Sequence, residues 1–383
     1  MKNLCRQLKA YPIVVLFLAF LMGFAILDEL WPKRGYSEME NRDLAQRPAF
    51  SIAGVMSKDP NKTWMAQYNE YTKDQVAFRD GWINVKSRTE NVLLKTENNG
   101  VWYGGDHYLF AKVLEVGPYY QRNLGALQKF AERHPGQADV MIVPSASLVL
   151  EEKLPWRAPI MDEDAYLDEV GAKLDGLANV YDMRGVLAAH KDEYIFYRTD
   201  HHWTTDGAFY AYEAYAQANG LPVFDRAAAQ ARTAEGFYGT NYSKARNHDA
   251  VADTITWYDL PNQLTLFKTQ KDGTKAQEAG LLMDTAALET RDKYRAFLRG
   301  NNGYSEIEGS GEGSILVVKD SYANCFIPFL TADYAKIGVV DFRDNLDKLD
   351  AIMAQGGYDK VLFLYSLDGF STDTYLAARI ATP

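Results

Sequence analysis

The chain has 383 residues, of which 47% are hydrophobic and 24% are charged. A chain of this length can bury a sizeable core, as one large domain or two ordinary ones, without disulfide bonds or structural metals. The formal charge of −10 at pH 7 and the lack of a long run of Lys and Arg argue against a nucleic-acid partner, because phosphate binding needs clustered cations.

An apolar segment near the N-terminus indicates the compartment. Residues 11–27 form an uncharged apolar run that ends at Asp28 and Glu29, and three cations precede it: Lys2, Arg6 and Lys9. Because positive charge is retained on the cytoplasmic side, we predict a cytoplasmic tip and signal-anchor helix over residues 1–30. The bulk of the protein is then extracytoplasmic, in the periplasm or at the cell surface. The run is short for a spanning helix, so a cleaved signal peptide and a buried cytoplasmic helix remain alternatives.

Cysteine usage agrees with export. The sequence has two cysteines, Cys5 and Cys325. Since Cys5 would lie on the cytoplasmic side, the exported part can form no internal disulfide bond.

The next segment, residues 31–99, is polar and predicts a helical lead-in. Aromatic residues at helical spacing between Trp64 and Tyr71 indicate one helix, and residues 81–94 indicate another. Two short β-like runs within residues 101–110 flank Gly104, Gly105 and Asp106, a pattern typical of a hairpin.

From residue 119 onward helices and apolar runs alternate. Helices are expected near residues 119–133, 162–177, 322–334 and 346–355, and strands near residues 139–144, 180–183, 315–318, 337–340 and 361–365. The alternation of helices and apolar runs is absent over about residues 230–313. We interpret this stretch as an irregular insertion that either shapes a substrate cleft or is purely structural. The pattern predicts an α/β domain over residues 100–383 with a mostly parallel central sheet covered on both faces.

The densest group of reactive side chains is Asp200, His201, His202 and Trp203. A helix is predicted directly after it, over residues 206–219, because Thr204 or Thr205 can cap its start and Gly220 with Pro222 can end it. Loops at helix entrances often carry catalytic residues on a rigid scaffold.

A second candidate is Ser321, which follows the apolar run of residues 315–318 and precedes a predicted helix. Binding sites in α/β sheets collect at such strand ends, although a serine there is often only a helix cap. A nucleophilic serine needs a base and a group that orients the base. In an extended segment residues i and i+2 share a side, so we predict His202 as the base and Asp200 as its orienting partner, with His201 pointing away.

These residues resemble a known family. The stretch from Thr199 to Trp203 resembles the motif that names the DHHW family of bacterial envelope proteins. Asp200, His202 and Trp203 are also similar to the signature of the alginate O-acetyltransferase proteins, whose catalytic domain resembles SGNH hydrolases. The similarity extends to residues 40–42, 78–80, 101–110, 237–240 and 320–322. It implies an SGNH-hydrolase-like sandwich and a triad of Ser321, His202 and Asp200, in which the Asp and His precede the Ser.

The remaining site candidates have structural alternatives. Lys319 stands where the Gly-Asp-Ser pattern has Gly, and Asp320 is either part of that element or a helix cap. The Ser321 amide and Asn324 are candidate oxyanion donors, and Arg343 is a candidate anion ligand or a surface ion-pair partner. Trp203 and Tyr197 either stack on sugar rings or pack in the core.

A metal site is the rival interpretation of Asp200, His201 and His202. Adjacent side chains diverge in an extended chain, and the sequence has no second His or Cys cluster with ligand spacing, so we predict neither a metal nor a cofactor.

The resemblance implies an O-acyltransferase, usually of acetyl groups, or an esterase that acts on a cell-envelope polysaccharide or exopolysaccharide. Both reactions use the same nucleophile and oxyanion hole, so the sequence does not separate them, nor does it name the acyl donor, the polymer or the oligomeric state. The expected partners are the polysaccharide, the membrane and, where acyl groups are delivered, a membrane-bound donor protein. A non-catalytic polysaccharide-binding or envelope-assembly protein that retains the fold is the alternative.

Overall fold

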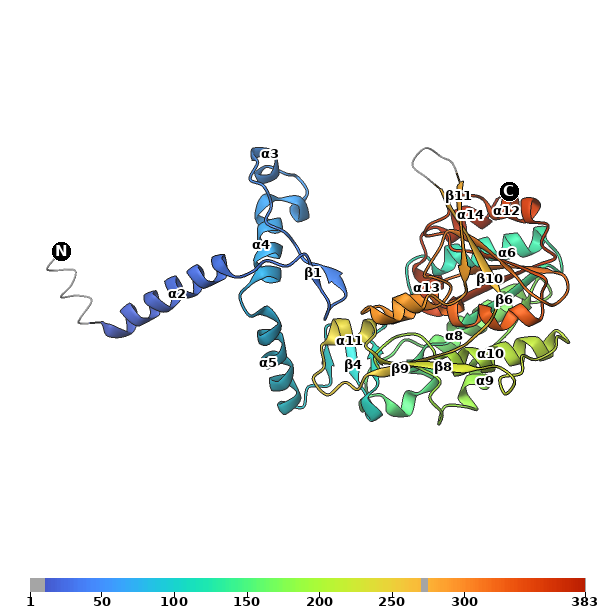
Figure 1. Cartoon of the computed structure of the whole chain (residues 1–383), viewed down its shortest axis with the longest axis horizontal. Helices are drawn as coiled ribbons and strands as arrows, with labels where there is room; N and C mark the ends of the chain where they lie inside the picture. Colours follow the sequence, from blue (N-terminus) through green and yellow to red (C-terminus); the bar gives the residue numbers. More distant parts are fainter. Residues whose placement is uncertain (1–10, 270–274, 383) are drawn as a thin grey trace. The chain divides into compact units, whose positions relative to one another are not determined.

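The computed structural model describes residues 11–269 and 275–382. The chain divides into two compact units, Met1–Lys95 and Thr96–Pro383, whereas the sequence prediction placed the boundary after residue 99 (Figure 1). Each unit is described separately.

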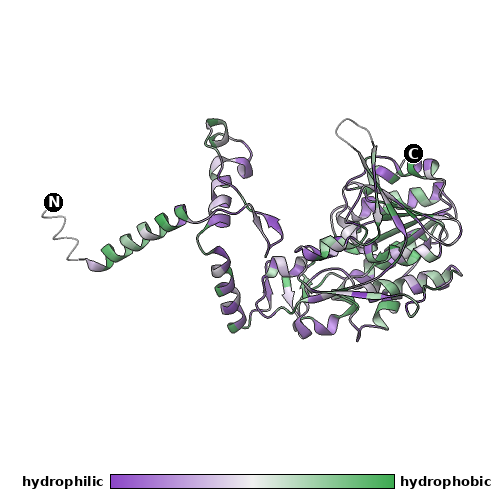
Figure 2. Ribbon diagram, viewed as in Figure 1, coloured by the Kyte–Doolittle hydropathy of each residue, from purple (hydrophilic) through white to green (hydrophobic). Residues whose placement is uncertain are grey.

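The first unit begins with the apolar helix α2, Pro12–Leu30, which is hydrophobic along its length (Figure 2). Its mean hydropathy of 2.4 and its 19 residues suit a membrane span, and none of it is buried. The helix coincides with the segment that the sequence predicts as a signal anchor, and its length and composition also suit a signal sequence; residues 1–10 lie outside the described part of the chain.

Polar contacts hold the rest of the first unit together. The short strands β1, Tyr36–Ser37, and β2, Arg42–Asp43, pair antiparallel, and three helices follow: α3, Ile52–Val55; α4, Trp64–Gln75; and α5, Arg79–Val92. Asp74 of α4 accepts hydrogen bonds from the Arg42 guanidinium at 2.9 Å and from the Ala45 amide at 2.8 Å. Arg79 of α5 pairs with Glu40 at 2.8 Å, so partly buried ion pairs tie both helices to the β1–β2 segment.

The second unit contains an eight-stranded sheet in the order β11-β10-β12-β14-β13-β15-β6-β7. Its parallel part consists of β14, Lys336–Val340; β13, Ser314–Lys319; β15, Lys360–Ser366; β6, Ala138–Val143; and β7, Asn179–Val180. Its antiparallel part consists of β12, Tyr304–Glu308; β10, Gln263–Thr269; and β11, Lys275–Leu281. The sheet is therefore mixed. The prediction of a mostly parallel sheet holds only for the part from β14 to β7, which includes β13, the strand that leads to Ser321.

The central strands are buried on both faces, as their continuous apolar sequences predict. On one face Val317 and Leu364 pack in a cluster with helix α10, Thr205–Ala218. On the other face Val318 and Phe363 pack with α6, Tyr120–Arg133; α8, Glu163–Leu174; and α12, Leu349–Gly356. Alternate residues of each strand thus belong to two separate cores.

Two elements differ from the sequence prediction. In the stretch expected to be irregular, about residues 230–313, the residues outside the undescribed 270–274 form five strands: β8, Ala231–Phe237; β9, Asp253–Tyr258; and β10 to β12. Several of these strands are polar edge strands, so they carry little of the apolar signal that marks a buried strand. The helix expected over residues 322–334 is two 3₁₀ helices, η6, Ser321–Cys325, and η7, Ile327–Ala332. Pro328 near the start of η7 lacks the amide that a continuous α-helix would need there.

The predicted hairpin over residues 101–110 is present. Strand β4, Val101–Tyr103, pairs antiparallel with β5, Leu109–Ala111, and β3, Glu97–Asn98, extends this small sheet. The Leu109 amide donates to the Arg198 carbonyl at 2.7 Å, so the hairpin supports the loop that carries Asp200.

Candidate active site

A tight loop positions Asp200 and the two histidines. An antiparallel bridge joins Phe196 to Trp203, and the Tyr197 amide donates to the His202 carbonyl at 3.2 Å, so the intervening residues are held in a closed turn. Helix α10 begins directly afterwards, with the Thr204 hydroxyl accepting a hydrogen bond from the Gly207 amide at 3.3 Å. The cap that the sequence predicts therefore fixes the exit of the loop.

Ser321 lies at the carboxyl end of β13, as the first residue of η6. Asp320, just before it, accepts hydrogen bonds from the Tyr322 amide at 2.9 Å and from the Ser366 amide and hydroxyl at 2.9 and 2.7 Å. Asp320 thus caps the turn and ties it to the end of β15, which holds the Ser321 backbone in place.

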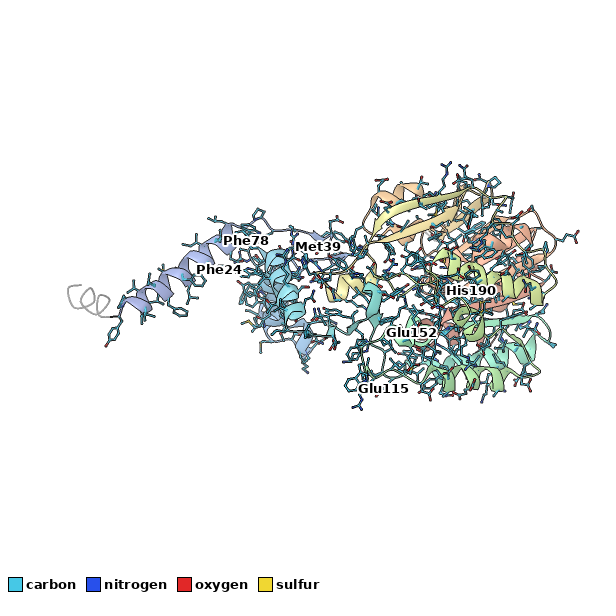
Figure 3. The ribbon with its side chains drawn as sticks, turned by 90° about the horizontal axis from the view of Figure 1, so that it is seen from below. Phe24, Met39, Phe78, Glu115, Glu152 and His190 are labelled. Carbon is cyan, nitrogen blue, oxygen red and sulfur yellow. The ribbon has the colours of Figure 1, made fainter. Side chains whose placement is uncertain are left out.

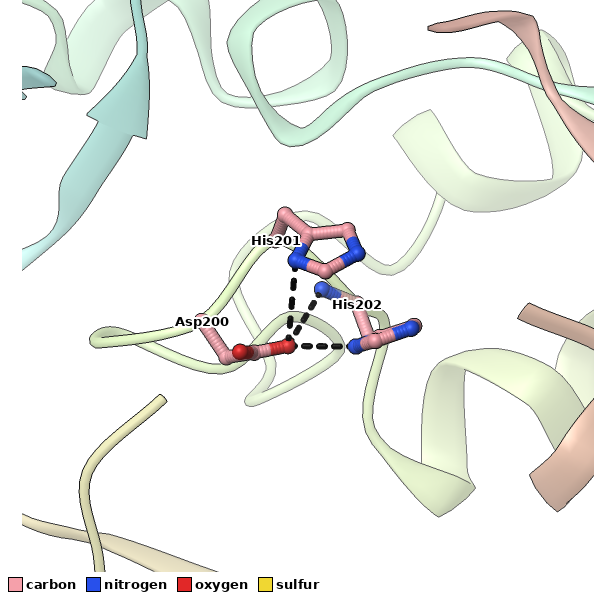
Figure 4. A group of neighbouring side chains, drawn as sticks. All are labelled: Asp200, His201 and His202. Carbon is pink, nitrogen blue, oxygen red and sulfur yellow. Dashed lines mark hydrogen bonds and ion pairs between the residues drawn. The ribbon is translucent and has the colours of Figure 1, made fainter. Parts of the chain in front are cut away.

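The loop and the strand end bring the three predicted residues together. The Ser321 hydroxyl lies 2.7 Å from His202 Nε2. His202 Nδ1 forms a short hydrogen bond with Asp200 Oδ1 (Figure 4). Asp200 Oδ1 also accepts from the His202 backbone amide at 3.0 Å. A proton on Nδ1, held by Asp200, leaves Nε2 free to accept the Ser321 proton, which is the arrangement that nucleophilic catalysis by serine requires.

The second oxygen of Asp200 is held by Thr240, which directly follows Gly239. Asp200 Oδ2 accepts from the Thr240 amide at 2.7 Å and from its hydroxyl at 3.1 Å. Burial alone would raise the pKa of Asp200, but His201, His202 and these hydrogen bonds hold that pKa below its usual range. The carboxylate therefore stays ionised at neutral pH and can stabilise a protonated His202.

Gly239 allows this approach. A Cβ at residue 239 would lie 2.2 Å from Asp200 Oδ2 and 2.2 Å from Asp200 Cβ, so Ala cannot fit without moving the carboxylate. We expect Gly239→Ala to lower ester-hydrolysis activity about 10²-fold, because small misplacements of catalytic groups are costly. Overpacking should also lower stability by about 1–3 kcal/mol.

A matched control is Gly125→Ala in α6, where nothing lies within 4 Å of the added Cβ. It should keep full activity and gain about 0.5–1 kcal/mol of stability from the reduced entropy of the unfolded chain. Steady-state kinetics and thermal unfolding check both variants. Full activity in a folded Gly239→Ala protein would contradict the role given to Asp200.

His201 is placed differently from the prediction that it points away. Its Nδ1 lies 3.6 Å from Asp200 Oδ1 and 2.7 Å from the Thr240 hydroxyl, and its ring centroid is 3.8 Å from that of His202. The prediction assumed an extended segment, whereas the closed turn brings consecutive side chains to one side (Figure 4).

Asp200, His201 and His202 are also close enough to share a metal, since their ligand atoms lie within 4.8 Å of one another. In this structure both ring nitrogens of His202 are hydrogen-bonded, to Asp200 and to Ser321. A metal bound through His202 would therefore replace one of the two contacts that the serine chemistry needs.

Tyr294 is a site residue that the sequence reasoning missed. Its ring stacks on His202 with centroids 3.9 Å apart and planes inclined by 13°, and its hydroxyl donates to the Ser321 carbonyl at 3.0 Å. Tyr294 belongs to η5, Lys293–Ala296, within the stretch predicted to be irregular. No local pattern distinguishes it from the other tyrosines, because its role arises from tertiary contacts alone.

Two residues that were candidates for substrate binding lie in the core instead. Trp203 and Tyr197 are 0% and 1% exposed, and the Trp203 indole donates to the Tyr322 carbonyl at 2.9 Å. Tyr197 packs edge-to-face on Tyr294 and Phe237. Neither ring reaches a surface on which a sugar could stack, so both pack behind the triad, as the alternative interpretation had it.

The other two candidates for oxyanion or substrate binding, Asn324 and Arg343, belong to a polar network beside Ser321. Asn324 is buried and donates to Asn301 Oδ1 at 3.1 Å, and the Lys319 ammonium donates to the same oxygen at 2.9 Å. Arg343 is bound to Asp341, with Nε 2.9 Å from Oδ1, so it forms the ion pair that was the alternative to anion binding. No described residue accepts a hydrogen bond from the Ser321 amide, which leaves that N–H available as an oxyanion donor.

A cavity of 240 Å³ adjoins the triad. Asp200, His201, Thr240 and Tyr322 line one part of it, and its polar lining continues through Ser145, Glu163, Lys244 and Asp368. A larger cavity of 440 Å³ is mainly apolar and has Cys325 in its wall but no residue of the triad. The smaller cavity is therefore the better candidate for a substrate site, because one triad residue, Asp200, and two residues next to the triad in sequence, His201 and Tyr322, line it.

Residues 167–340 match the family model described as DHHW protein, and Asp200, His202 and Ser321 all fall within the match. The predicted resemblance to the DHHW family is confirmed. A search of curated proteins finds no match.

Several solved structures resemble this chain over about three quarters of its length. A DHHW family protein from Eubacterium siraeum DSM 15702 is 24% identical, with a TM-score of 0.64 over 74% of this chain and 95% of that one. Bacillus cereus PatB1 with a sulfonyl adduct is 19% identical, with a TM-score of 0.58 over 73% and 97% of the two chains. The O-acetyltransferase domain of Pseudomonas putida AlgJ is 16% identical, with a TM-score of 0.45 over 73% and 95%. The chain thus shares a mixed α/β fold with the first two structures.

Proposed function

We propose that the protein is an extracytoplasmic, membrane-anchored O-acyltransferase or esterase that uses Ser321, His202 and Asp200 on a cell-envelope polysaccharide or exopolysaccharide. The observation that carries the proposal is the continuous hydrogen-bonded path from Ser321 Oγ through His202 to Asp200. The resemblance of the Asp200 to Trp203 stretch to the polysaccharide O-acetyltransferase signature supports the choice of acetyl as the acyl group.

The proposed reaction has two steps. Ser321 Oγ attacks the acyl carbonyl while His202 Nε2 takes its proton, and the alkoxide of the donor leaves with a proton returned by His202. A hydroxyl of the polysaccharide, or water, then loses its proton to His202 and attacks the acyl-serine, which releases Ser321. The Ser321 amide supports the oxyanion in both steps. The acceptor, sugar or water, distinguishes transferase from esterase.

The test is the release of acetate from an activated acetyl ester, such as 4-nitrophenyl acetate, by the full chain in detergent or nanodiscs. Wild-type turnover with a pre-steady-state burst would support an acyl-serine intermediate. Adding envelope polysaccharide then separates the two outcomes, because a transferase moves acetyl to the polymer whereas an esterase releases acetate at an unchanged rate.

The alternative is a non-catalytic polysaccharide-binding or envelope-assembly protein. It predicts no burst and no turnover above the uncatalysed rate, with polymer binding retained. A sulfonyl adduct is present in a structure of PatB1, and a sulfonyl fluoride is therefore a suitable probe of Ser321 reactivity that needs no natural substrate.

A further inference from the structure

Helix α5 of the first unit carries an exposed apolar stripe. Trp82, Val85 and Val92 lie on one face at helical spacing, with Phe78 at the N-cap and Leu93 just past the end of the helix. These side chains are between 49% and 81% exposed, although a soluble surface rarely leaves so many large apolar groups close together on one helix face; within the row, only the position of Thr89 is polar. We therefore expect another apolar surface to cover the stripe.

The opposite face of α5 is turned toward the rest of the unit. Arg79 is held there by Glu40, and Ser87 is buried. Two exposed cations, Lys86 and Arg88, flank this face on its two sides, because Lys86 follows Val85 by one residue, or about 100° of helix rotation, and Arg88 precedes Thr89, which lies between Val85 and Val92 on the face, by one residue. An apolar face bordered by cations is typical of helices that lie in the headgroup region of a bilayer.

The stripe begins where the anchor helix α2 ends. Asp28 of α2 accepts a hydrogen bond from the Ala77 amide at 2.7 Å, and the Trp31 ring lies 4.1 Å from the Phe78 ring, centroid to centroid. Figure 3 shows Phe78 beside the end of α2, and α5 runs across the axis of α2 instead of continuing it (Figure 1). A helix held at this point and in this direction lies along the surface of any bilayer that α2 crosses.

The backbone conformation of Phe78 is strained, and it places the Phe78 ring against Trp31. Its φ of +59° is in the left-handed region, which is unfavourable for a bulky residue. The strained turn sends the chain from α4 into α5 while the Phe78 ring stays against Trp31. Aromatic residues are enriched at the interface between lipid and water, where Trp31, Phe78 and Trp82 would lie.

We propose that α5 is an interfacial helix whose stripe of Phe78, Trp82, Val85, Val92 and Leu93 lies on the outer leaflet of the membrane that α2 spans. The inference rests on the proposed anchor role of α2 and is independent of the chemistry at Ser321. The first unit would then contact the membrane twice, through α2 across the bilayer and through α5 on its surface. These two contacts would fix the orientation of the unit on the bilayer, whereas α2 alone would let it tilt.

The test uses the full chain, with Cys5→Ser, in nanodiscs of phosphatidylethanolamine and phosphatidylglycerol. Single cysteines at Val85→Cys and Val92→Cys carry a bimane label, and Asn84→Cys is the matched control on the same helix, one residue off the stripe. Cys325 is 1% exposed, and burial raises the pKa of its thiol to about 12, so it stays unlabelled. An N-terminal tag reports whether α2 is retained.

Lipids brominated high in the acyl chain should quench the labels at residues 85 and 92 at least several-fold more than the label at residue 84. Equal quenching at all three positions, or none, would overturn the inference. Labels that are shielded from water but not quenched would show that protein covers the stripe, which also overturns it, as would loss of the tag through cleavage of α2. Acetyl-ester turnover in the same nanodiscs reports separately on Ser321, so failure of one proposal is distinguishable from failure of the other.

Discussion

Replacing Asp200 by Asn should lower kcat/KM for acetyl-ester hydrolysis by about 10³- to 10⁴-fold without unfolding the protein, the size of effect seen when a triad carboxylate becomes an amide. The reason lies in the four hydrogen bonds that Asp200 accepts. Its Oδ1 faces the His202 amide at 3.0 Å as well as His202 Nδ1, and its Oδ2 faces the Thr240 amide at 2.7 Å.

An Asn side chain has one acceptor and one donor, so either orientation opposes its NH₂ group to a backbone N–H. If the NH₂ group faces His202, the imidazole must accept at Nδ1 and carry its proton on Nε2, where it can no longer take the Ser321 proton. If the NH₂ group faces Thr240, it opposes the Thr240 amide, and the segment at Gly239 and Thr240 is pushed away from residue 200. The check is steady-state kinetics with circular dichroism as the folding control. A folded variant that keeps activity within about tenfold of wild type would contradict the role of Asp200 as the orienting group.

Ser321→Ala and His202→Ala should each abolish turnover above background, a loss of about 10⁵- to 10⁶-fold, and the double variant should lose no more than either single one. This non-additivity follows from the 2.7 Å contact between Ser321 Oγ and His202 Nε2, because each group is useless for acyl transfer without the other. Multiplicative losses would mean that the two residues act in separate steps.

Matched controls for these variants are an exposed serine and an exposed histidine outside the site, Ser310→Ala and His248→Ala. Both should keep wild-type kinetics. Initial rates with 4-nitrophenyl acetate, corrected for spontaneous hydrolysis, are measured for the five variants and the wild type.

Local sequence signals predicted the residues around the triad because each depends on short-range rules. The helix after Trp203 needs only a Thr cap at one end and Gly220 at the other, and α10 occupies Thr205–Ala218. The apolar run before Ser321 is a central strand, β13, for which burial on both faces requires an unbroken run of large aliphatic residues. The pairing of Asp200 with His202 was expected from their i, i+2 spacing, and the family resemblance directed attention to Ser321.

Other features depend on contacts between distant residues. Strand β10 pairs with both β11 and β12, and nothing in its own sequence indicates these neighbours or its antiparallel direction. Tyr294 reaches His202 from a 3₁₀ turn that no periodicity marks. Trp203 and Tyr197 were candidates for a sugar surface because aromatic rings serve both surfaces and cores, and only the packed structure shows that they are buried.

The central claim is that Ser321 is an activated nucleophile, and the most direct measurement is covalent labelling by methanesulfonyl fluoride followed by peptide mass spectrometry. Ser321 Oγ would form a bond to sulfur as fluoride leaves, with His202 taking the hydroxyl proton. The account predicts one methanesulfonyl group, on the peptide that contains Ser321, in wild type, with no such label in Ser321→Ala and strongly slowed labelling in Asp200→Asn. A folded wild-type protein that remains unlabelled at Ser321, or that labels other serines at the same rate, would contradict it.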